Sequence, residues 1–434
     1  MDTVIKKSLR YSVFDGIFAS IMMGCSETFI SPYAIAMGAS ARMVGLLAAL
    51  PSLAGALIQV KSAALSERLG SRKALIVAAV FLQAVMWLPI IAIPYIVSRY
   101  QVPWLIALYT VLIAVGIVSF PPWSSLMAEH VAAPDRGKYF GWRNRILGVT
   151  NIIAMLASGI VLHLSKKFSA TAITGFTVIF SVACAARLCC CYFLAKMHEP
   201  KLVIKDEHRF TMLDFLKRMR HSNFGRFAIF AALINFSVFL SGPFFAVYML
   251  RDLKFSYLTY TIITMTSTLT IFAMMRVWGS HADHVGNRRV LRLTSYFLPF
   301  IPVLWVFSHN VAYLVAVQIF GGFFWAGFNM SSSNFIYDCV TPEKRTRCVA
   351  YSNVINGIAI FAGASTGGFL ARCLPPIYGN RLLSLFVLSG LLRLAASPIC
   401  SMIKEVRQVK HVSSLELFYS IITARQPSSL YESR

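Results

Sequence analysis

The sequence contains few charged residues, and few of those are acidic. Charged residues make up 13% of the 434 positions, about half of the fraction found in soluble domains. The chain also lacks Gly/Ser-rich linkers and low-complexity segments. Hydrophobic residues account for 57% of the chain, and they fall in runs long enough to cross a bilayer core of about 30 Å. These features exclude a series of soluble domains and predict an all-α polytopic membrane protein.

Catalytic and cofactor-binding motifs are also lacking. The sequence contains no Walker A, HExxH or GxSxG pattern, so we expect neither ATP coupling nor an enzyme. The nine cysteines include no CxxC pair, and most lie in apolar runs, where a reduced thiol behaves as a small hydrophobic group. The histidines of the central polar segment have no partner at ligand spacing. We therefore expect no metal and no cofactor.

The positive charge has an explanation in membrane topology. The net charge of +24 is compatible with nucleic-acid binding, but lysines and arginines concentrate in the N-terminal tail, every second loop and the C-terminal tail. Basic loops stay on the cytoplasmic side of a membrane. We therefore expect both termini to be cytoplasmic and no nucleic-acid partner. The first apolar run contains Asp15 and Glu27, which is not typical of a cleaved signal peptide.

The apolar runs predict twelve membrane helices in two groups of six. A cytoplasmic tail (1–10) precedes a first bundle (11–195), and a linker (196–223) with a short surface helix near 210–219 leads to a second bundle (224–403) and a cytoplasmic tail (404–434). The helices are expected near 11–37, 43–65, 73–97, 103–129, 144–165, 170–195, 224–250, 256–279, 289–308, 312–338, 347–371 and 380–403. Residues 134–145 are expected to form a basic turn.

Two charged turns resemble each other, about half a chain apart. The later turn reads GSHADHVGNRR and the earlier region reads AALSERLGSRK. Each contains an acid, a glycine that permits a tight reversal, and basic residues. The earlier copy comprises Glu67, Arg68, Gly70, Arg72 and Lys73, and the later one comprises Gly279, Asp283, Gly286, Arg288 and Arg289. A charged turn that occurs twice indicates a duplicated architecture.

Other matches between the halves occur in the same order. Ala186-Arg187-Leu188 corresponds to Leu392-Arg393-Leu394, and Ser31-Pro32-Tyr33 resembles Gly242-Pro243-Phe244. Twelve spans, a basic central linker and the turn G-x-x-x-D-x-x-G-x-[KR]-[KR] resemble the major facilitator superfamily over residues 10–403. The earlier turn departs from this pattern at Ala63 and Glu67.

The resemblance implies a two-bundle fold with alternating access. In this family two six-helix bundles enclose a central cavity lined by the first, fourth, seventh and tenth helices, and the bundles rock to open it to each side in turn. It also implies that the charged turns act as a gating clamp when the cytoplasmic side is closed. The alternative is that their basic residues only orient the loops.

Glu27 is the most informative single residue. It lies near the middle of the first predicted helix, where an acid usually faces a partner or a water-filled cavity because burial in lipid is costly. We interpret it as a site for proton coupling or for a substrate cation. The alternative is a neutral glutamic acid hydrogen-bonded between helices.

Three further acids are placed near basic residues. Asp15 is expected about one turn from the cytoplasmic end of its helix, paired with Arg143 or Arg145, which start the fifth helix. Glu129 and Asp338 end the fourth and tenth helices. We interpret these two as gate or salt-bridge residues rather than as substrate ligands.

Aromatic and amide side chains occur where the cavity is expected. A cavity with aromatic walls and a few amides suits a small organic molecule. The alternative is packing and hydrogen bonding between helices, at about 1 kcal/mol per polar contact. The candidates for substrate or proton binding, with Glu27, are Trp123, Asn235, Trp325, Asn329, Asn353 and Asn356.

The sequence as a whole predicts secondary active or facilitative transport of a small organic solute, with protons as a possible second partner. Alternatives are an efflux or lipid-translocating relative, and a receptor or scaffold that keeps the fold without transport. We expect a monomer in contact with membrane lipids. Its short outer loops lack N-x-[ST] sites, which is typical of a bacterial inner-membrane protein.

Overall fold

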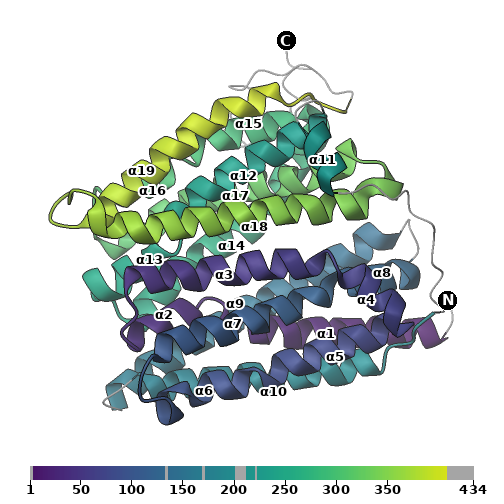
Figure 1. Ribbon diagram of the computed structural model, residues 1–434, viewed down its shortest axis with the longest axis horizontal. Helices are drawn as coiled ribbons and strands as arrows, with labels where there is room; N and C mark the ends of the chain where they lie inside the picture. Colours follow the sequence, from purple (N-terminus) through teal and green to yellow (C-terminus); the bar gives the residue numbers. More distant parts are fainter. Residues whose placement is uncertain (1–2, 132–134, 169–171, 201–211, 220–221, 408–434) are drawn as a thin grey trace, which may run out of the picture. The chain divides into compact units, whose positions relative to one another are not determined.

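A computed structural model of the chain describes residues 3–131, 135–168, 172–200, 212–219 and 222–407 (Figure 1). Within these ranges the fold is all-α, as predicted. Eleven helical stretches of this part are long and apolar enough to cross a membrane. The predicted span at 289–308 is present as two shorter helices, α15 (Asn287–Phe297) and α16 (Phe300–Leu304). They are separated at Pro299, whose ring is incompatible with a helix interior.

The first four predicted spans are each divided into two helices, whereas the fifth and sixth are continuous. The fourth divides at Ser119, just before Pro121 and Pro122, which lie in the first turn of the following helix where proline is tolerated. The helices are α1 (Thr3–Ser26), α2 (Ile30–Ala36), α3 (Ala41–Gln59), α4 (Ser62–Leu69), α5 (Arg72–Val85), α6 (Trp87–Ile96), α7 (Gln101–Val118), α8 (Phe120–His130), α9 (Arg136–Phe168) and α10 (Ile173–Ala195).

The second half begins with the short helix predicted in the linker. It is α11 (Met212–Arg218), close to the expected range of 210–219. The predicted seventh span is interrupted at Gly242 and Pro243, and it ends in a π-helical turn. The remaining elements are α12 (Asn223–Ser241), α13 (Phe244–Val247), η2 (Tyr248–Asp252), α14 (Tyr257–Val285), α17 (Val311–Cys339), α18 (Pro342–Cys373), α19 (Arg381–Ala396) and η3 (Ser397–Met402).

Several predicted helix ends were wrong in the same direction. α1 begins at Thr3, α9 includes most of the basic turn expected at 134–145, and α14 continues to Val285 through most of the later charged turn. The sequence-based prediction ended each helix where charged residues follow the apolar run. Lysine and arginine are good helix formers, so a helix continues past the apolar segment until a residue such as Gly286 ends it. Asp15, Arg143 and Arg145 therefore lie well inside their helices.

Contacts divide the chain into two compact units. The first unit comprises Met1–Asp206 together with Pro243–Thr261, and the second comprises Glu207–Gly242 together with Ile262–Arg434. In the first unit α10 packs against α1 and α5, and α3 packs against α7. In the same unit the Tyr260 hydroxyl donates a hydrogen bond to the Thr28 carbonyl oxygen at 2.9 Å. The domain boundaries expected from the sequence, with a linker at 196–223, stay a prediction.

The second unit has an aromatic core. α12 packs against α18 and α19, and α15 packs against α17. Trp278, Phe230 and Phe335 are fully buried in this core. Between membrane helices such side chains stabilise the packed state through van der Waals contacts rather than through removal from water. The charged turn at the end of α14 is therefore attached to a well-packed core.

Candidate functional site

The charged turn of the first unit is closed by a glutamate from beyond α10. Gly70 adopts a φ of 63°, which reverses the chain before α5. The Glu199 carboxylate accepts hydrogen bonds from Ser71 Oγ at 2.6 Å, from the Arg72 backbone N–H at 2.6 Å and from the Lys73 backbone N–H at 3.1 Å. Its negative charge lies at a helix N-terminus, where the helix dipole stabilises it.

Arg72 joins the start of α5 to the end of α8. Its side chain is buried, and its guanidinium binds both carboxylate oxygens of Glu129, at 2.6 and 2.9 Å. Such a bidentate, charge-assisted pair is among the stronger hydrogen-bonded contacts in proteins. The predicted salt-bridge role of Glu129 is confirmed. Lys73 donates to the Met197 carbonyl oxygen at 3.0 Å, whereas Arg68 is exposed. The side chain of Glu67 lies outside the described residues.

The charged turn of the second unit is closed in the same way. Gly286 adopts a φ of 90°, and the Glu405 carboxylate accepts a hydrogen bond from the Arg288 backbone N–H at 2.8 Å. The Arg288 side chain donates to the Ser401 carbonyl oxygen at 2.9 Å. Each unit thus has a glutamate, Glu199 or Glu405, that binds the N-terminus of the helix after its charged turn.

The acids of the second turn share an arginine that the sequence analysis did not select. Arg407 lies 2.9 Å from Asp283 and 2.8 Å from Asp338. Asn287 also donates a hydrogen bond to Asp338, at 2.7 Å. The predicted salt bridge of Asp338 is therefore confirmed, with Arg407 as its partner. Arg288 does not repeat the role of Arg72, because Arg407 takes that place.

The remaining residues of the second turn have separate positions. A Cβ atom at Gly279 would lie 2.5 Å from the terminal methyl group of Met330, a flexible side chain on α17. Arg289 is partly exposed. The residue pattern correctly identified Gly70 and Gly286 as the glycines that reverse the chain. The residues that cap the following helices, Glu199 and Glu405, lie outside the two motifs.

Glu199, Glu405 and Arg407 were missed because they follow the last apolar run of each half. The sequence predicts a polar linker around Glu199 and a polar tail around Glu405 and Arg407. One signal was present in the sequence: Glu199 and Glu405 follow Arg187 and Arg393, respectively, at the same distance along the chain. Extending the comparison of the halves past the last helix would have found this match.

A second charged cluster lies buried inside the first unit. Asp15 is 3.5 Å from an Arg143 guanidinium nitrogen, and it accepts hydrogen bonds from Trp123 Nε1 at 3.2 Å and from the Cys190 thiol at 2.9 Å. The Arg143 guanidinium also lies over the Trp123 ring, 4.7 Å from its centroid. The predicted pairing of Asp15 with Arg143 is confirmed, and Arg145 is exposed.

Glu27 lies at the break between α1 and α2. Its side chain is exposed, and its carboxylate has no hydrogen-bond or ion-pair partner among the residues that the structure describes. The first span is therefore interrupted at the position of its second acid. An unpaired carboxylate at this depth requires water or a ligand for its solvation.

The amide and aromatic candidates of the second unit only partly come together. Asn235 in α12 donates a hydrogen bond to Asn356 in α18 at 3.2 Å, so these two residues join their helices. Asn353 is half-buried on the same helix as Asn356. On α17, Asn329 is exposed, and the half-buried Trp325 contacts Phe328 with ring centroids 5.5 Å apart. Binding roles for these residues stay predictions.

These features define a multi-pass membrane protein built from two helical units, each with a carboxylate-capped charged turn. The model of the Major Facilitator Superfamily matches residues 16–241 and 227–417, so the chain belongs to this superfamily. It is accordingly a membrane transporter rather than an enzyme. No curated protein sequence matches the chain.

Several solved transporter structures share the fold. The nucleoside transporter NupG superposes with a TM-score of 0.70 at 11% identity, covering 93% of this chain and 99% of that one. A D-xylose–proton symporter gives 0.69 at 13% identity, with 94% and 99% covered. A bacterial homologue of the human lysosomal transporter Spinster gives 0.62 at 14% identity, with 98% of each chain covered. At such identities the likeness concerns the fold alone.

Proposed function

We propose that this transporter carries a small polar organic solute by alternating access and that Glu27 couples its movement to protons. The observation that carries the proposal is the exposed carboxylate of Glu27 at the break in the first span, which has no hydrogen-bond or ion-pair partner among the residues that the structure describes. A carboxylate at that depth is strongly disfavoured in lipid, so a water-filled cavity is its expected surrounding. A carboxylate in contact with such a cavity can load and release a proton.

Asp15 is the competing acid in the same span, and its contacts favour a different role. Arg143, Trp123 and Cys190 all contact its carboxylate. Protonation would weaken the ion pair and leave the buried Arg143 without its compensating charge, which is unfavourable. Asp15 is therefore suited to holding α1, α8, α9 and α10 together, whereas no hydrogen bond or ion pair of the described residues engages the Glu27 carboxylate.

The solute class is inferred from the side chains and supported by the related structures. Aromatic faces and amides are supplied by Trp325 and Asn329 on α17, by Asn235 and Asn356 between α12 and α18, and by Asn353 and Trp123. Such groups bind rings and hydroxyls through stacking and hydrogen bonds. Two structural relatives are a nucleoside transporter and a D-xylose–proton symporter. We infer a solute of similar size and polarity.

The proposed setting is a bacterial inner membrane, with a monomeric protein and cytoplasmic termini. The alternation of basic-rich and basic-poor loops supports this orientation. In it, both carboxylate-capped turns lie on the cytoplasmic side. Their ion pairs are then suited to hold the inner ends of the helices while the cavity opens and closes.

Purified protein in liposomes tests the proposal. Nucleosides and monosaccharides are first screened by thermal shift, because a ligand stabilises the state that binds it. Uptake of a radiolabelled hit is then measured with and without an imposed proton gradient. We expect Glu27→Gln to abolish accumulation above equilibrium while solute exchange without a gradient continues, because a glutamine cannot carry the proton.

Glu27→Asp is the matched control, since it keeps the carboxylate, and it should retain part of the uphill accumulation. Uphill accumulation by Glu27→Gln at the wild-type level would refute the coupling role. A wild-type protein that binds a solute but never moves it would instead indicate a receptor with this fold.

A further inference from the structure

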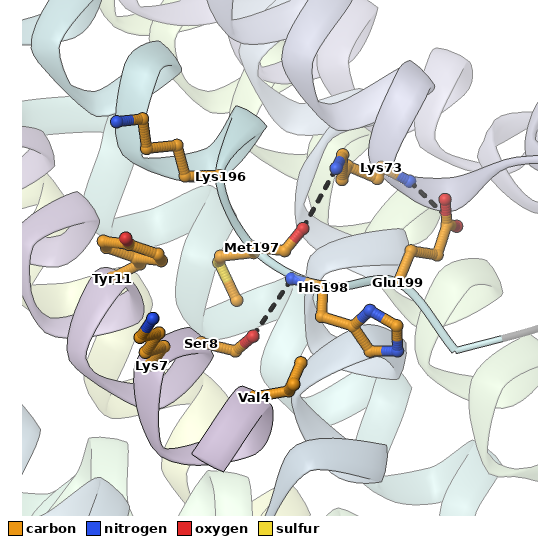
Figure 2. Close-up of a pocket in the computed structure, with 9 residues that line it drawn as sticks. All are labelled: Val4, Lys7, Ser8, Tyr11, Lys73, Lys196, Met197, His198 and Glu199. Atoms are coloured by element: carbon orange, nitrogen blue, oxygen red, sulfur yellow. Dashed lines mark hydrogen bonds between the residues drawn. The ribbon is translucent and has the colours of Figure 1, made fainter.

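A basic pocket lies at the end of the first unit where α1 begins and α10 ends, beside the Glu199 carboxylate that caps α5. Its volume is about 530 Å³, and Figure 2 shows the side chains that line it. Lys7 comes from α1, Lys73 from α5 and Lys196 from the residue directly after α10. Three lysines from three separate elements thus line one pocket; the Lys73 ammonium binds the Met197 carbonyl oxygen, and the Lys196 ammonium lies against the Tyr192 ring.

The pocket has a fixed floor formed by the chain just after α10. The His198 backbone N–H donates a hydrogen bond to Ser8 Oγ at 3.0 Å, and Ser8 is itself buried on α1. Lys73 holds the Met197 carbonyl oxygen at 3.0 Å, and Glu199 is held by the N-terminus of α5. Because these contacts anchor each residue from 197 to 199, the pocket is formed before any ligand arrives.

The charges of the pocket favour an anion. Its only acid, Glu199, is already occupied by Ser71 Oγ and two backbone N–H groups. Lys7 and Lys196 are exposed, so a ligand can reach Lys7 directly and can reach Lys196 beside its contact with Tyr192. A hydrogen bond with Tyr192 raises the pKa of Lys196, whose ammonium also lies 4.4 Å from the Tyr192 ring centroid. Lys196 therefore stays protonated at neutral pH.

Aromatic side chains of α1 and α10 lie next to the pocket. Tyr11 lines the pocket, and Phe14, one turn further along α1, is exposed and stacks on Phe193 with ring centroids 5.1 Å apart. Tyr192 is exposed beside them. Aromatic side chains of this kind are enriched where a protein crosses from lipid to headgroups. A ligand with a charged head and an apolar body would fit both parts.

We propose that this pocket binds the phosphate group of an anionic ligand, and its aromatic surroundings favour the headgroup of an anionic phospholipid over a soluble phosphate. Lysine ammonium groups bind phosphate as point charges. Basic residues near a membrane surface add to the affinity for anionic lipids individually. The pocket is separate from the residues proposed to bind solute or protons.

The test measures lipid and phosphate binding by the full-length purified protein. Native mass spectrometry counts bound phosphatidylglycerol after extraction from nanodiscs of phosphatidylcholine with added phosphatidylglycerol. Thermal unfolding is followed in parallel with inorganic phosphate. We expect the double variant Lys7→Gln/Lys196→Gln to bind phosphatidylglycerol about thirtyfold more weakly, from the usual contribution of two surface lysines. It leaves Lys73 and the pocket floor in place.

Lys6→Gln is the matched control, because Lys6 is the exposed neighbour of Lys7 on α1 and does not line the pocket. It should bind lipid like the wild type, and Lys7→Arg/Lys196→Arg should restore binding. Stabilisation by inorganic phosphate but not by phosphatidylglycerol would assign the pocket to a soluble phosphate. Equal lipid and phosphate binding by the double variant and the wild type would overturn the proposal.

Discussion

At the scale of the residue, Gly286 illustrates how one backbone conformation holds the charged turn. Its φ of 90° lies in a region that side chains disfavour, and a Cβ atom there would collide with the Glu405 carboxylate. The same carboxylate binds the Arg288 backbone N–H. The glycine therefore serves two purposes, since it allows the reversal and leaves room for the helix cap.

We predict that Gly286→Ala destabilises the protein by about 1 to 3 kcal/mol, the usual cost of a strained backbone conformation. The thermal unfolding midpoint of the purified variant is the measurement. Gly141→Ala is the matched control, because Gly141 is exposed in α9 and a Cβ atom there meets nothing within 4 Å. The control should be neutral or slightly stabilising. Equal midpoints for both variants would contradict the role of the turn.

At the scale of the element, α5 and α15 share one design. The first helix starts on Glu199 and the second on Glu405, and each glutamate follows the last helix of its own half. A carboxylate at a helix N-terminus is stabilised by the free backbone N–H groups and by the helix dipole. The charged turns are thus held by the chain beyond the sixth and twelfth spans, not only by their own residues.

We predict that Glu199→Gln and Glu405→Gln loosen the first turns of α5 and α15, respectively. Each variant loses the negative charge but keeps a hydrogen-bond acceptor, so the first turn of the helix loses about 1 kcal/mol of local stability. This loss corresponds to roughly fivefold faster local amide exchange. Hydrogen exchange of peptides from residues 71–78 and 287–294 is the measurement. Each variant is the control for the other helix. Protection that stays unchanged at both helices would show that the caps contribute nothing to stability.

At the scale of the whole molecule, the proposed orientation has a natural reporter. Cys373 ends α18 and is exposed, at the opposite end of that span from Arg347. Most other cysteines are buried or half-buried, and the exposed Cys189 lies within α10. With both termini cytoplasmic, Cys373 faces the outside of the cell.

We predict that a membrane-impermeant maleimide labels the transporter in intact cells and that Cys373→Ser abolishes this labelling. The reason is that a thiol at the outer end of the span is reached without crossing the membrane, whereas thiols in apolar spans are shielded. Cys189→Ser is the control and should leave the signal unchanged. Labelling that requires permeabilised cells would reverse the proposed orientation.

Much of the fold was predictable because membrane spans depend on composition. The lengths of the apolar runs located the helices, and the repeated turn identified Gly70 and Gly286 as reversal points. The ends of helices were less predictable, because α9 and α14 continue beyond the apolar segment through charged residues, which a helix tolerates in water. Breaks such as the one at Glu27 were also missed, since no proline or glycine occupies that position.

The sequence by itself determined the family, the number of expected spans and the place of the charged turns, because hydrophobicity and turn residues act locally along the chain. Only the tertiary structure decided the partners: Arg143 rather than Arg145 for Asp15, Arg407 for Asp283 and Asp338, and the two capping glutamates. Such contacts join residues far apart in sequence. The later charged turn is thus recognisable from its own residues, but what holds it is Glu405 and Arg407, brought to it by folding.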